Sequence, residues 1–420
     1  MKRIFAKIST LLLLLTCQAS FATTLLNVVT NGTRLIITPI ANHTYPKMSI
    51  QMNSTEYCLT DLDNNCVASA LFSASKTSPK IFSITGPADP HLSVSLTICV
   101  NDDDPLTCKN YTTNNNPIAY VSNFGNDSVS LCSINSDGTF GDCGNSGIAG
   151  TPFKETYQMA LNASGTIAYV VDRRGLKIYR CSINVNGTFS TCIDSGNTGV
   201  SFKFPSGIAL NSAGTMAYVT NQTGGGQWGI SACPINADGS FGACVPAWSA
   251  GPRFNIPNGI TLNKAGTIAY IANFASNIVF MCPINANGTF EPCTDSGNNG
   301  VAFAGPFGII LNNVGNIAYI TNANNNTVSM CPINANGTFG TCVNAGNSGI
   351  AFDGPRGLAL NSTETIAYVT NFRNDVMSTC PVNSDGTFGV CASADNSGVE
   401  LNAPHWITLP KYHVAAQVSS

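Results

Sequence analysis

The sequence predicts an all-β chain in which a six-bladed β-propeller follows a small β-sandwich domain. Three observations lead to this fold class: a segment that recurs six times at a nearly fixed period, four short strand-like runs in each repeat, and incomplete repeats at both ends of the array. Periods of about 20–50 residues are typical of solenoids and propellers, and four strands per repeat are typical of a propeller blade.

The recurring segment has the core Ala-Tyr-Val or Ala-Tyr-Ile. In the fifth repeat the four strand-like runs are 308–311, 317–321, 327–332 and 338–342. They are rich in β-branched and aromatic residues and are separated by turn residues, without helical periodicity. A β-solenoid or a string of small sandwiches is the alternative. The alanines of the core lie at steps of 49, 49, 52, 49 and 49 residues, at Ala119, Ala168, Ala217, Ala269, Ala318 and Ala367.

The two ends of the array favour the propeller. The first repeat begins at Pro117 without a first strand, whereas segment 404–409 matches the first strand of a repeat and then stops. If the last strand completes the first blade, the ring closes and no sheet edge is left exposed at the junction. The sequence therefore predicts six blades and a closing C-terminal strand.

The segment Ala-Tyr-Val-Thr-Asn at 217–221 and again at 367–371 resembles the YVTN family of β-propeller repeats, which is related to lactonase-type and NHL-type propellers. Close variants stand in the other repeats, so the resemblance covers about residues 117–410. It implies the architecture but no single function, because such propellers include enzymes, surface proteins and scaffolds. The cysteines in every repeat and the count of six distinguish this chain from many relatives.

Each repeat carries two cysteines around an Asn-Gly or Asp-Gly, as in CPINANGTFGTC at 331–342. Asn-Gly favours a two-residue type I′ turn with positive φ at both residues. Counting outward from Asn336 and Gly337 then places Cys331 opposite Cys342, and opposed Cα atoms about 4.5–5.5 Å apart lie within disulfide range. We expect one disulfide per blade: Cys132–Cys143, Cys181–Cys192, Cys233–Cys244, Cys282–Cys293, Cys331–Cys342 and Cys380–Cys391.

Metal binding is the competing explanation of this motif. Zinc prefers four ligands at close Cys or His spacing, but the motif contains neither Cys-x-x-Cys nor histidine. Calcium prefers several carboxylates, and half of the turns have none. The sequence therefore favours disulfides, and it predicts no metal and no other cofactor.

The N-terminus indicates export. Basic residues, an apolar run and small residues up to Ala22 form a predicted signal peptide at 1–22. Cys17 leaves a lipoprotein signal as the alternative. The sixteen cysteines that follow it are an even number, which in an exported protein favours disulfides. We expect a periplasmic or extracellular protein.

Residues 23–113 lack the repeat and contain short runs of partial alternation. Two further close pairs, Cys58 with Cys66 and Cys99 with Cys108, predict additional disulfides in a small immunoglobulin-like β-sandwich. The alternative is a structural cap on the ring. We expect the propeller to span residues 114–410, followed by a tail at 411–420.

The composition limits the partners. Charged residues make up 10% of the chain and the formal net charge is −3. Nucleic-acid-binding proteins carry basic clusters, so no nucleic acid is expected. No stretch beyond the predicted signal peptide is long and apolar enough for a membrane helix.

One face of the predicted propeller varies from blade to blade. The loops between strands two and three and the loops between blades lie on this face, and function usually resides in such loops. The residue before the repeated Gly-Ile is expected to line the channel entrance. Arg356 and His405, with Arg253, Arg173 and Arg373 in neighbouring loops, could bind an anionic group there, although solvated charges are the alternative. The six positions are Tyr157, Ser206, Asn258, Phe307, Arg356 and His405.

The third repeat departs from the pattern twice on the same face. An insertion is followed by Trp228, and the loop to the next blade contributes Trp248 and Arg253. We expect Trp406 near the channel mouth. Exposed aromatic residues beside polar groups suit contact with a glycan or a protein. The alternative is that these tryptophans pack between blades.

No catalytic constellation is evident. The sequence contains no Gly-x-Ser-x-Gly elbow, phosphate loop or His-Glu-x-x-His motif. We therefore favour a non-catalytic propeller that binds a protein or a glycan. The alternatives are a lactonase- or lyase-like enzyme that uses His405 and Asp172, and an envelope scaffold that presents the N-terminal domain.

Overall fold

The computed structural model describes residues 117–146, 153–184, 187–223, 229–247, 253–394 and 401–410, together with the backbone of strands at 397–398, at 415–418 and between residues 29 and 114. Two compact units divide the chain: one comprises residues 1–117 and 412–420, the other residues 118–411. Among the described residues the structure is β throughout, apart from one short 3-10 turn at Phe274–Ser276.

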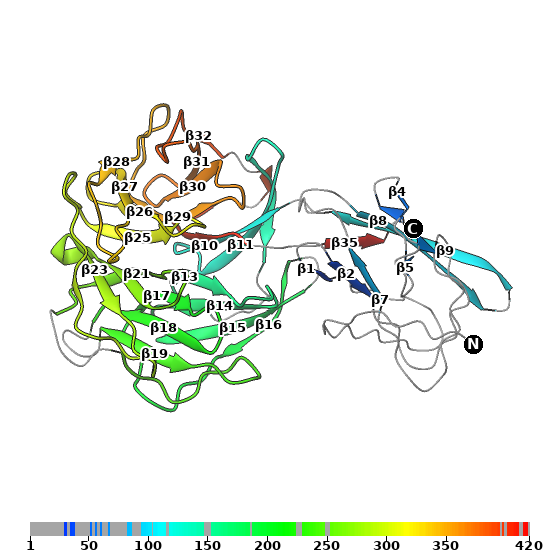
Figure 1. Ribbon diagram of the computed structural model, residues 1–420, viewed down its shortest axis with the longest axis horizontal. Coiled ribbons are helices and arrows are strands. Elements are labelled where there is room, and N and C mark those ends of the chain that lie inside the picture. Colours follow the sequence, from blue (N-terminus) through cyan, green and yellow to red (C-terminus); the bar gives the residue numbers. More distant parts are fainter. Residues whose placement is uncertain are drawn as a thin grey trace. The chain divides into compact units, whose positions relative to one another are not determined.

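The second unit is a propeller of six sheets (Figure 1). The first blade has β10 (Ile118–Asn123), β11 (Ser128–Ile134), β12 (Phe140–Asn145), β33 (Ser397–Gly398) and β34 (Pro404–Thr408); the second β13 (Thr156–Leu161), β14 (Ile167–Asp172), β15 (Lys177–Ile183) and β16 (Phe189–Asp194); the third β17 (Pro205–Leu210), β18 (Met216–Asn221), β19 (Ile230–Pro234) and β20 (Val245–Pro246). The fourth has β21 (Pro257–Leu262), β22 (Ile268–Asn273), β23 (Ile278–Pro283) and β24 (Thr294–Asp295); the fifth β25 (Pro306–Leu311), β26 (Ile317–Asn322), β27 (Thr327–Pro332) and β28 (Val343–Asn344); the sixth β29 (Pro355–Leu360), β30 (Ile366–Asn371), β31 (Val376–Pro381) and β32 (Ala392–Ser393).

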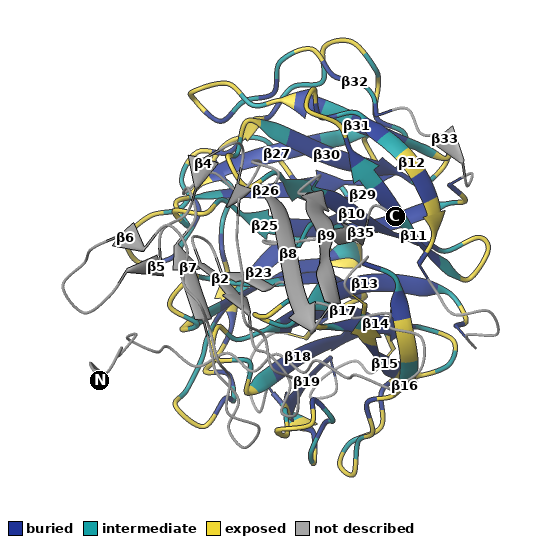
Figure 2. Ribbon diagram, turned by 90° about the vertical axis from the view of Figure 1, so that its right-hand side faces the viewer, coloured by how far each residue is buried: buried dark blue, intermediate teal, exposed yellow. Residues whose placement is uncertain are grey.

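The ring closes as predicted. Strand β34, near the C-terminus, pairs antiparallel with β10 and so becomes the innermost strand of the first blade. It also lies against β13 and β29, the innermost strands of the two neighbouring blades. The six-bladed count and the closing C-terminal strand are therefore confirmed. Figure 2 shows that the middle of each blade is buried, whereas the turns at the rim are exposed.

In the other unit the structure describes only strand backbone. Its sheets are β1–β2–β7 (Val29–Asn31, Arg34–Ile37, Phe82–Thr85), β3–β4 (Gln51–Met52, Thr55–Glu56), β5–β6 (Leu59–Thr60, Cys66–Val67) and β35–β9–β8 (Ala415–Val418, Asp104–Asn114, Val94–Asp102). Cys99 lies directly opposite Cys108 in the β8–β9 pair. The predicted signal peptide, Cys17 and Cys58 lie outside the described residues, and the immunoglobulin-like arrangement stays a prediction.

The six predicted disulfides of the propeller are confirmed. Each joins the third strand of a blade to the segment that forms its outer edge, with Cα atoms 4.0–4.2 Å apart. No bridge among them links two blades. Each closes a loop of 11 residues, so in the chain-entropy model each stabilises its hairpin by roughly 2–3 kcal/mol.

The predicted turn type in these hairpins is wrong. Only Gly337 has positive φ (87°), and its N–H donates to the Asn334 carbonyl at 2.9 Å, so the turn is centred on Ala335 and Asn336. Asn336 keeps negative φ because its side-chain oxygen accepts hydrogen bonds from the N–H and hydroxyl of Thr338. This is a three-residue hairpin loop that ends in a left-handed glycine and a bulge. The bulge shifts the register by one residue in the first blade, which leaves Cys132 opposite Cys143.

The tyrosine of the repeated core links each blade to the next. Its ring stacks on the phenylalanine of the neighbouring cysteine hairpin, with centroids 5.1–5.6 Å apart in all six junctions, including Tyr368 on Phe140 across the closure. In four junctions its hydroxyl donates to the carbonyl of the turn glycine, as from Tyr319 to Gly386 at 2.7 Å. The Asn-Gly-Thr-Phe motif is therefore a docking element for the preceding blade.

The threonine of the repeated Ala-Tyr-Val-Thr-Asn segment links the innermost strands of neighbouring blades. Thr321 accepts a hydrogen bond from the Gly308 N–H at 2.7 Å and donates to the Arg356 carbonyl of the next blade at 2.6 Å. The asparagine that follows caps the turn before the first strand, as when Asn221 accepts from the Lys203 N–H at 2.9 Å. Both motif residues are thus structural. Within the described part of the chain, no helix is long and apolar enough to cross a membrane.

Candidate functional site

The candidate site lies on one face of the propeller, which we call the site face. It carries the loops between the second and third strands and the loops between blades. Before each innermost strand the chain makes a left-handed turn, for example at Glu155 (φ 60°) and Phe204 (φ 50°). Two residues after this turn stands the residue that the sequence placed at the channel entrance. We call these six the first ring: Tyr157, Ser206, Asn258, Phe307, Arg356 and His405.

Four members of the first ring meet at the axis. The ring centroid of His405 lies 3.7 Å from that of Tyr157 and 5.0 Å from that of Phe307. The Arg356 guanidinium lies 4.8 Å above the Phe307 ring. All members except Arg356 are buried. They close the channel mouth instead of lining an open one. Ser206 donates to the Pro257 carbonyl at 2.8 Å, which ties two innermost strands together.

Sequence reasoning missed a second ring on the same face. It consists of the residue directly after the capping asparagine or aspartate in each blade. The shared repeat position was the signal that could have identified it. Its aromatic members Phe124, Phe274 and Phe372 are partly exposed and contact first-ring residues. The second ring is Phe124, Arg173, Gln222, Phe274, Ala323 and Phe372.

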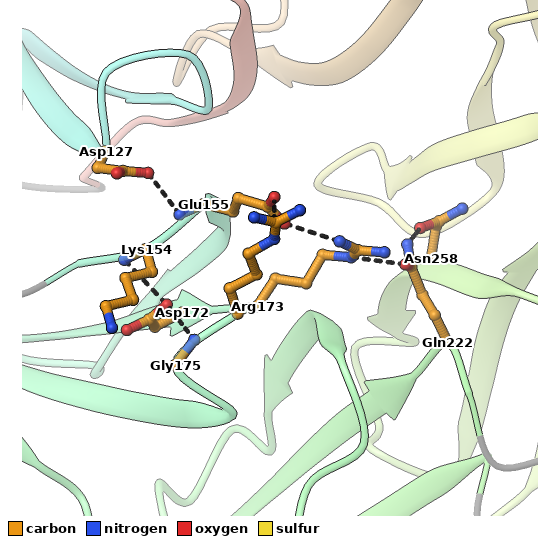
Figure 3. A network of polar contacts seen from close by, with 9 residues as sticks. Asp127, Lys154, Glu155, Asp172, Arg173, Gly175, Gln222 and Asn258 are labelled. Carbon is orange, nitrogen blue, oxygen red and sulfur yellow. Dashed lines mark hydrogen bonds and ion pairs between the residues drawn. The ribbon is translucent and has the colours of Figure 1, made fainter.

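Blades two to four contribute a polar sector (Figure 3). Arg173 donates to Glu155 at 2.7 Å and to the Gln222 side chain at 2.8 Å. Gln222 in turn donates to Asn258 at 2.6 Å. Glu155 also accepts from Arg174 at 2.7 Å, and its own N–H donates to Asp127 at 2.6 Å. Two donors of Arg173, Nε and Nη1, are therefore engaged, and it shares the charge of Glu155 with Arg174.

Blades five, six and one contribute an aromatic sector around Arg356. The guanidinium carbon of Arg356 lies 3.2 Å from the centre of the Phe372 ring. Burial, together with the nearby Arg373 and Arg173, lowers the pKa of Arg356 to about 10, so it stays charged at neutral pH. Among the described residues, no carboxylate forms an ion pair with it. It is a half-buried cation without a counter-charge.

His405 lies beneath this sector. Its side chain is 1% exposed, and neither ring nitrogen has a hydrogen-bond partner among the described residues. Burial and the cations Arg356 and Arg173 hold its pKa well below the usual value, so the imidazole is neutral at physiological pH. It therefore adds no charge to the site.

Below the first ring the channel is filled by two side chains. Gln158 accepts from the Ile208 N–H at 3.1 Å and donates to the Ile260 carbonyl at 3.3 Å, reaching two other innermost strands. Trp406 is 5% exposed, and a Cβ on Gly308 would lie 3.2 Å from its ring. At this repeat position the other four blades have glycine: Gly207, Gly259, Gly308 and Gly357. Trp406 is thus a filling residue and not an exposed contact.

The remaining sequence candidates fall in different places. Trp228 and Trp248 lie outside the described residues, and Arg253 is exposed. Asp172, considered for a lactonase-like site, caps the turn of the second blade by accepting from the N–H groups of Lys154 and Gly175 at 3.0 and 2.9 Å. In the segments that the structure describes, no three His, Cys, Asp or Glu residues gather as a metal site would require.

Comparisons with known proteins relate the chain to one family. Residues 164–398, more than half of the chain, match the family described as lactonase, 7-bladed beta-propeller. The structure of the nidogen/laminin complex matches with a TM-score of 0.53 at 13% identity, covering 70% of this chain and 99% of that one. The periplasmic gluconolactonase PpgL of Pseudomonas aeruginosa matches with a TM-score of 0.50 at 14% identity, with the same coverage of 70% and 99%.

A putative 6-phosphogluconolactonase of Bacteroides fragilis matches with a TM-score of 0.47 at 16% identity, covering 88% and 99%. No curated protein matches the sequence significantly. Identities this low show the fold alone. The family match covers more than half of the chain and includes the first-ring and second-ring residues of blades three to six. The chain belongs to the lactonase 7-bladed β-propeller family, within which it closes its ring with six blades.

Proposed function

We propose that this protein is an extracytoplasmic, non-catalytic binding module whose glycan or protein ligand binds the site face over the propeller axis. One observation carries the proposal. The residues that join the blades keep the same type around the ring, whereas the two rings at the axis differ from blade to blade. They also bring half-exposed aromatic side chains and an unpaired cation together. Such a combination is typical of ligand recognition on a rigid scaffold.

The disulfides support a cellular compartment outside the cytoplasm. Six disulfides, one in each blade, require an oxidising environment to form and persist. This supports a location outside the cytoplasm, and the predicted signal peptide is consistent with it. A ligand is therefore sought among molecules of the periplasm or the cell exterior.

The chemistry of the site favours binding over catalysis. A general base must reach its substrate directly or through one water molecule. His405 is buried beneath aromatic rings, Glu155 is engaged by two arginines, and Asp172 is buried as a turn cap. None of these three groups is an exposed base that is free to accept a proton, and the more exposed carboxylates of the same face, Asp127, Asp353 and Asp375, are each already engaged by a backbone N–H or an arginine.

A lactonase is the second candidate, because the family match favours it. A specific contact supports it as well: Tyr157 lies against His405, and both Tyr157 and Arg356 contact Phe307, so these polar side chains could hold a lactone carbonyl. Its test is hydrolysis of aldonolactones followed by pH-stat titration. Hydrolysis by the wild-type protein that is abolished by His405→Asn would support the enzymatic function and contradict the binding proposal.

The binding proposal is tested with purified protein on an array of glycans and on immobilised extracellular-matrix and cell-surface proteins. We expect saturable binding that falls at least tenfold when Phe124 and Phe372, whose rings pack edge to face at 5.5 Å, are both changed to alanine. The matched control is Val314→Ala, because Val314 is 71% exposed and stands in a turn between first and second strands. Equal loss in the control, or no effect of the double substitution, would contradict the proposed face.

A further inference from the structure

We infer that the ligand of the site face is an acidic saccharide and that Arg356 binds its carboxylate. This inference rests on the proposed function and names the ligand class of the same site.

Arg356 differs from four of the other five propeller arginines in having no acidic partner among the described residues; the fifth, Arg253, also has none but is exposed to solvent. Arg173 and Arg174 share Glu155, Arg180 pairs with Asp238 at 3.3 Å, and Arg373 pairs with Asp353 at 3.6 Å. Among the described residues, no such ion pair exists for Arg356, although it is one of the more buried of the set. A buried cation without a counter-charge is costly, so a site that retains one is suited to an anion supplied from outside.

The packing of Arg356 leaves the directions that a carboxylate needs. Its guanidinium lies over the face of Phe372 and over the ring of Phe307, so apolar rings cover part of its flat surface. The five N–H donors lie in the plane of the group, and no carboxylate among the described residues pairs with them. A planar carboxylate pairs with such a fork through two parallel hydrogen bonds.

The charge of the site favours one carboxylate over a phosphate group. Glu155 already engages Arg173 and Arg174, and His405 is neutral and buried. A phosphate carries close to two negative charges at neutral pH and would leave part of its charge unmatched beside a single open guanidinium. One carboxylate matches one arginine.

The surroundings favour a sugar as the carrier of this carboxylate. Phe124 and Phe372 are partly exposed, and Arg356 covers one face of Phe372, so the remaining exposed ring surface is apolar surface of the kind that packs on the C–H groups of a pyranose. On the opposite side of the mouth, Gln222 and Arg173 hold polar groups in a fixed network that suits hydroxyl groups (Figure 3). A uronic acid unit combines the carboxylate, the hydroxyl groups and the apolar face.

The experiment measures binding of tri-galacturonic acid and of its methyl ester by isothermal titration calorimetry. The ester keeps the sugar rings, removes the negative charges and adds one methyl group at each carboxyl. We expect the wild-type protein to prefer the acid by at least tenfold, with a preference that decreases between 50 and 500 mM salt because an exposed ion pair is screened. This comparison needs no variant, so it stands even if a substitution at the axis impairs folding.

Substitution then assigns the charge to one residue. Arg356→Gln should reduce affinity for the acid at least tenfold, about 1.4 kcal/mol, while affinity for the ester changes less than threefold. Arg373→Gln is the matched control because Arg373 lies on the same face, is more exposed and is already paired with Asp353. It should change either affinity less than threefold. Thermal unfolding of each variant reports its folding.

The possible failures are distinguishable. Equal binding of acid and ester overturns the acidic-ligand inference and leaves the binding module intact, as does binding of a different, neutral glycan on the array. An acid preference that survives Arg356→Gln overturns the role of Arg356. Binding of no glycan or protein on the arrays, together with lactone hydrolysis, overturns the proposed function itself.

Discussion

The cysteine hairpin at the rim and the two rings at the axis occupy equivalent places in all six blades, yet they differ in what the repeat preserves. At the rim, every blade presents an Asn-Gly or Asp-Gly turn, a phenylalanine and a disulfide. At the axis, each blade presents a different pair of side chains. The rim phenylalanine and turn glycine contact the neighbouring blade and the disulfide holds their hairpin together, so a change there affects a junction, whereas most ring residues take no part in these repeated contacts.

The largest effect is expected where one blade docks on the next. Tyr319→Ala removes the stack on Phe388 and the hydrogen bond to Gly386. We expect a loss of about 3–5 kcal/mol in the free energy of unfolding, as for other buried aromatic truncations, measured by urea denaturation. Tyr319→Phe keeps the stack and should cost only about 1–2 kcal/mol. Equal losses in the two variants would show that the hydrogen bond, and not the stack, holds the junction.

A smaller effect is expected from the disulfides. Replacing both Cys331 and Cys342 by alanine should lower the free energy of unfolding by roughly 2–3 kcal/mol, because the bridge closes a short loop within one blade. The same change in the third blade, at Cys233 and Cys244, provides the matched comparison. If one pair costs far more than the other, the blades are not energetically equivalent at the rim.

The next prediction exploits the one blade that has aspartate where the others have a capping asparagine. Burial raises the pKa of Asp172 to about 6, and its Oδ2 atom has no partner among the described residues. Since the folded-state pKa is raised, the carboxyl is harmless below about pH 4 and costs stability as the pH rises through about 6. Asp172→Asn should therefore stabilise the protein by about 1–3 kcal/mol at pH 7 and by almost nothing at pH 4.

Urea denaturation of wild type and variant at both pH values measures this difference. Asn221→Asp in the third blade is the reverse test, and it should destabilise at pH 7 more than at pH 4. Asn221 accepts a hydrogen bond from the Lys203 N–H, as Asp172 accepts one from the Lys154 N–H. A pH-independent effect in both variants would contradict the assigned protonation change.

The smallest effect is expected from exchanging the two turn residues that occur at the rim. Asp385 accepts from the N–H and hydroxyl of Thr387 at 2.9 and 2.6 Å, and Asn336 accepts the same pair from Thr338 at 3.1 and 2.7 Å. Asp385→Asn should therefore shift Tm by less than about 2 °C, measured by scanning calorimetry. A larger shift would mean that charge, and not hydrogen bonding, holds the turn.

The architecture could be predicted from the sequence because the same pattern of strands and turns occurs in six repeats. The spacing of Ala119 and its counterparts predicted the blades, segment 404–409 predicted the closure, and the paired cysteines predicted each bridge. The turn type was missed because Asn-Gly is compatible with two loops. The choice between them depends on the hydrogen bonds of Thr338, which the pattern alone does not reveal.

The candidate site was predicted less completely than the fold. The first ring could be read from one repeat position, and the structure brings Tyr157, Phe307, Arg356 and His405 together. Whether each side chain is buried or exposed depends on packing across the axis, between residues about 50 to 250 positions apart in the sequence. The engagement of Arg173 by Glu155 and the filling role of Trp406 could therefore not be inferred from spacing.

The position of β34 has a consequence for biogenesis. Each hairpin bridge joins cysteines that are close in the chain, so it can form locally, without any other blade. The first blade is different, because its innermost strand follows the strand with which it pairs by nearly 300 residues. The ring therefore cannot close until residues 404–408 are in place, and a truncation that removes them would leave the first blade without its innermost strand.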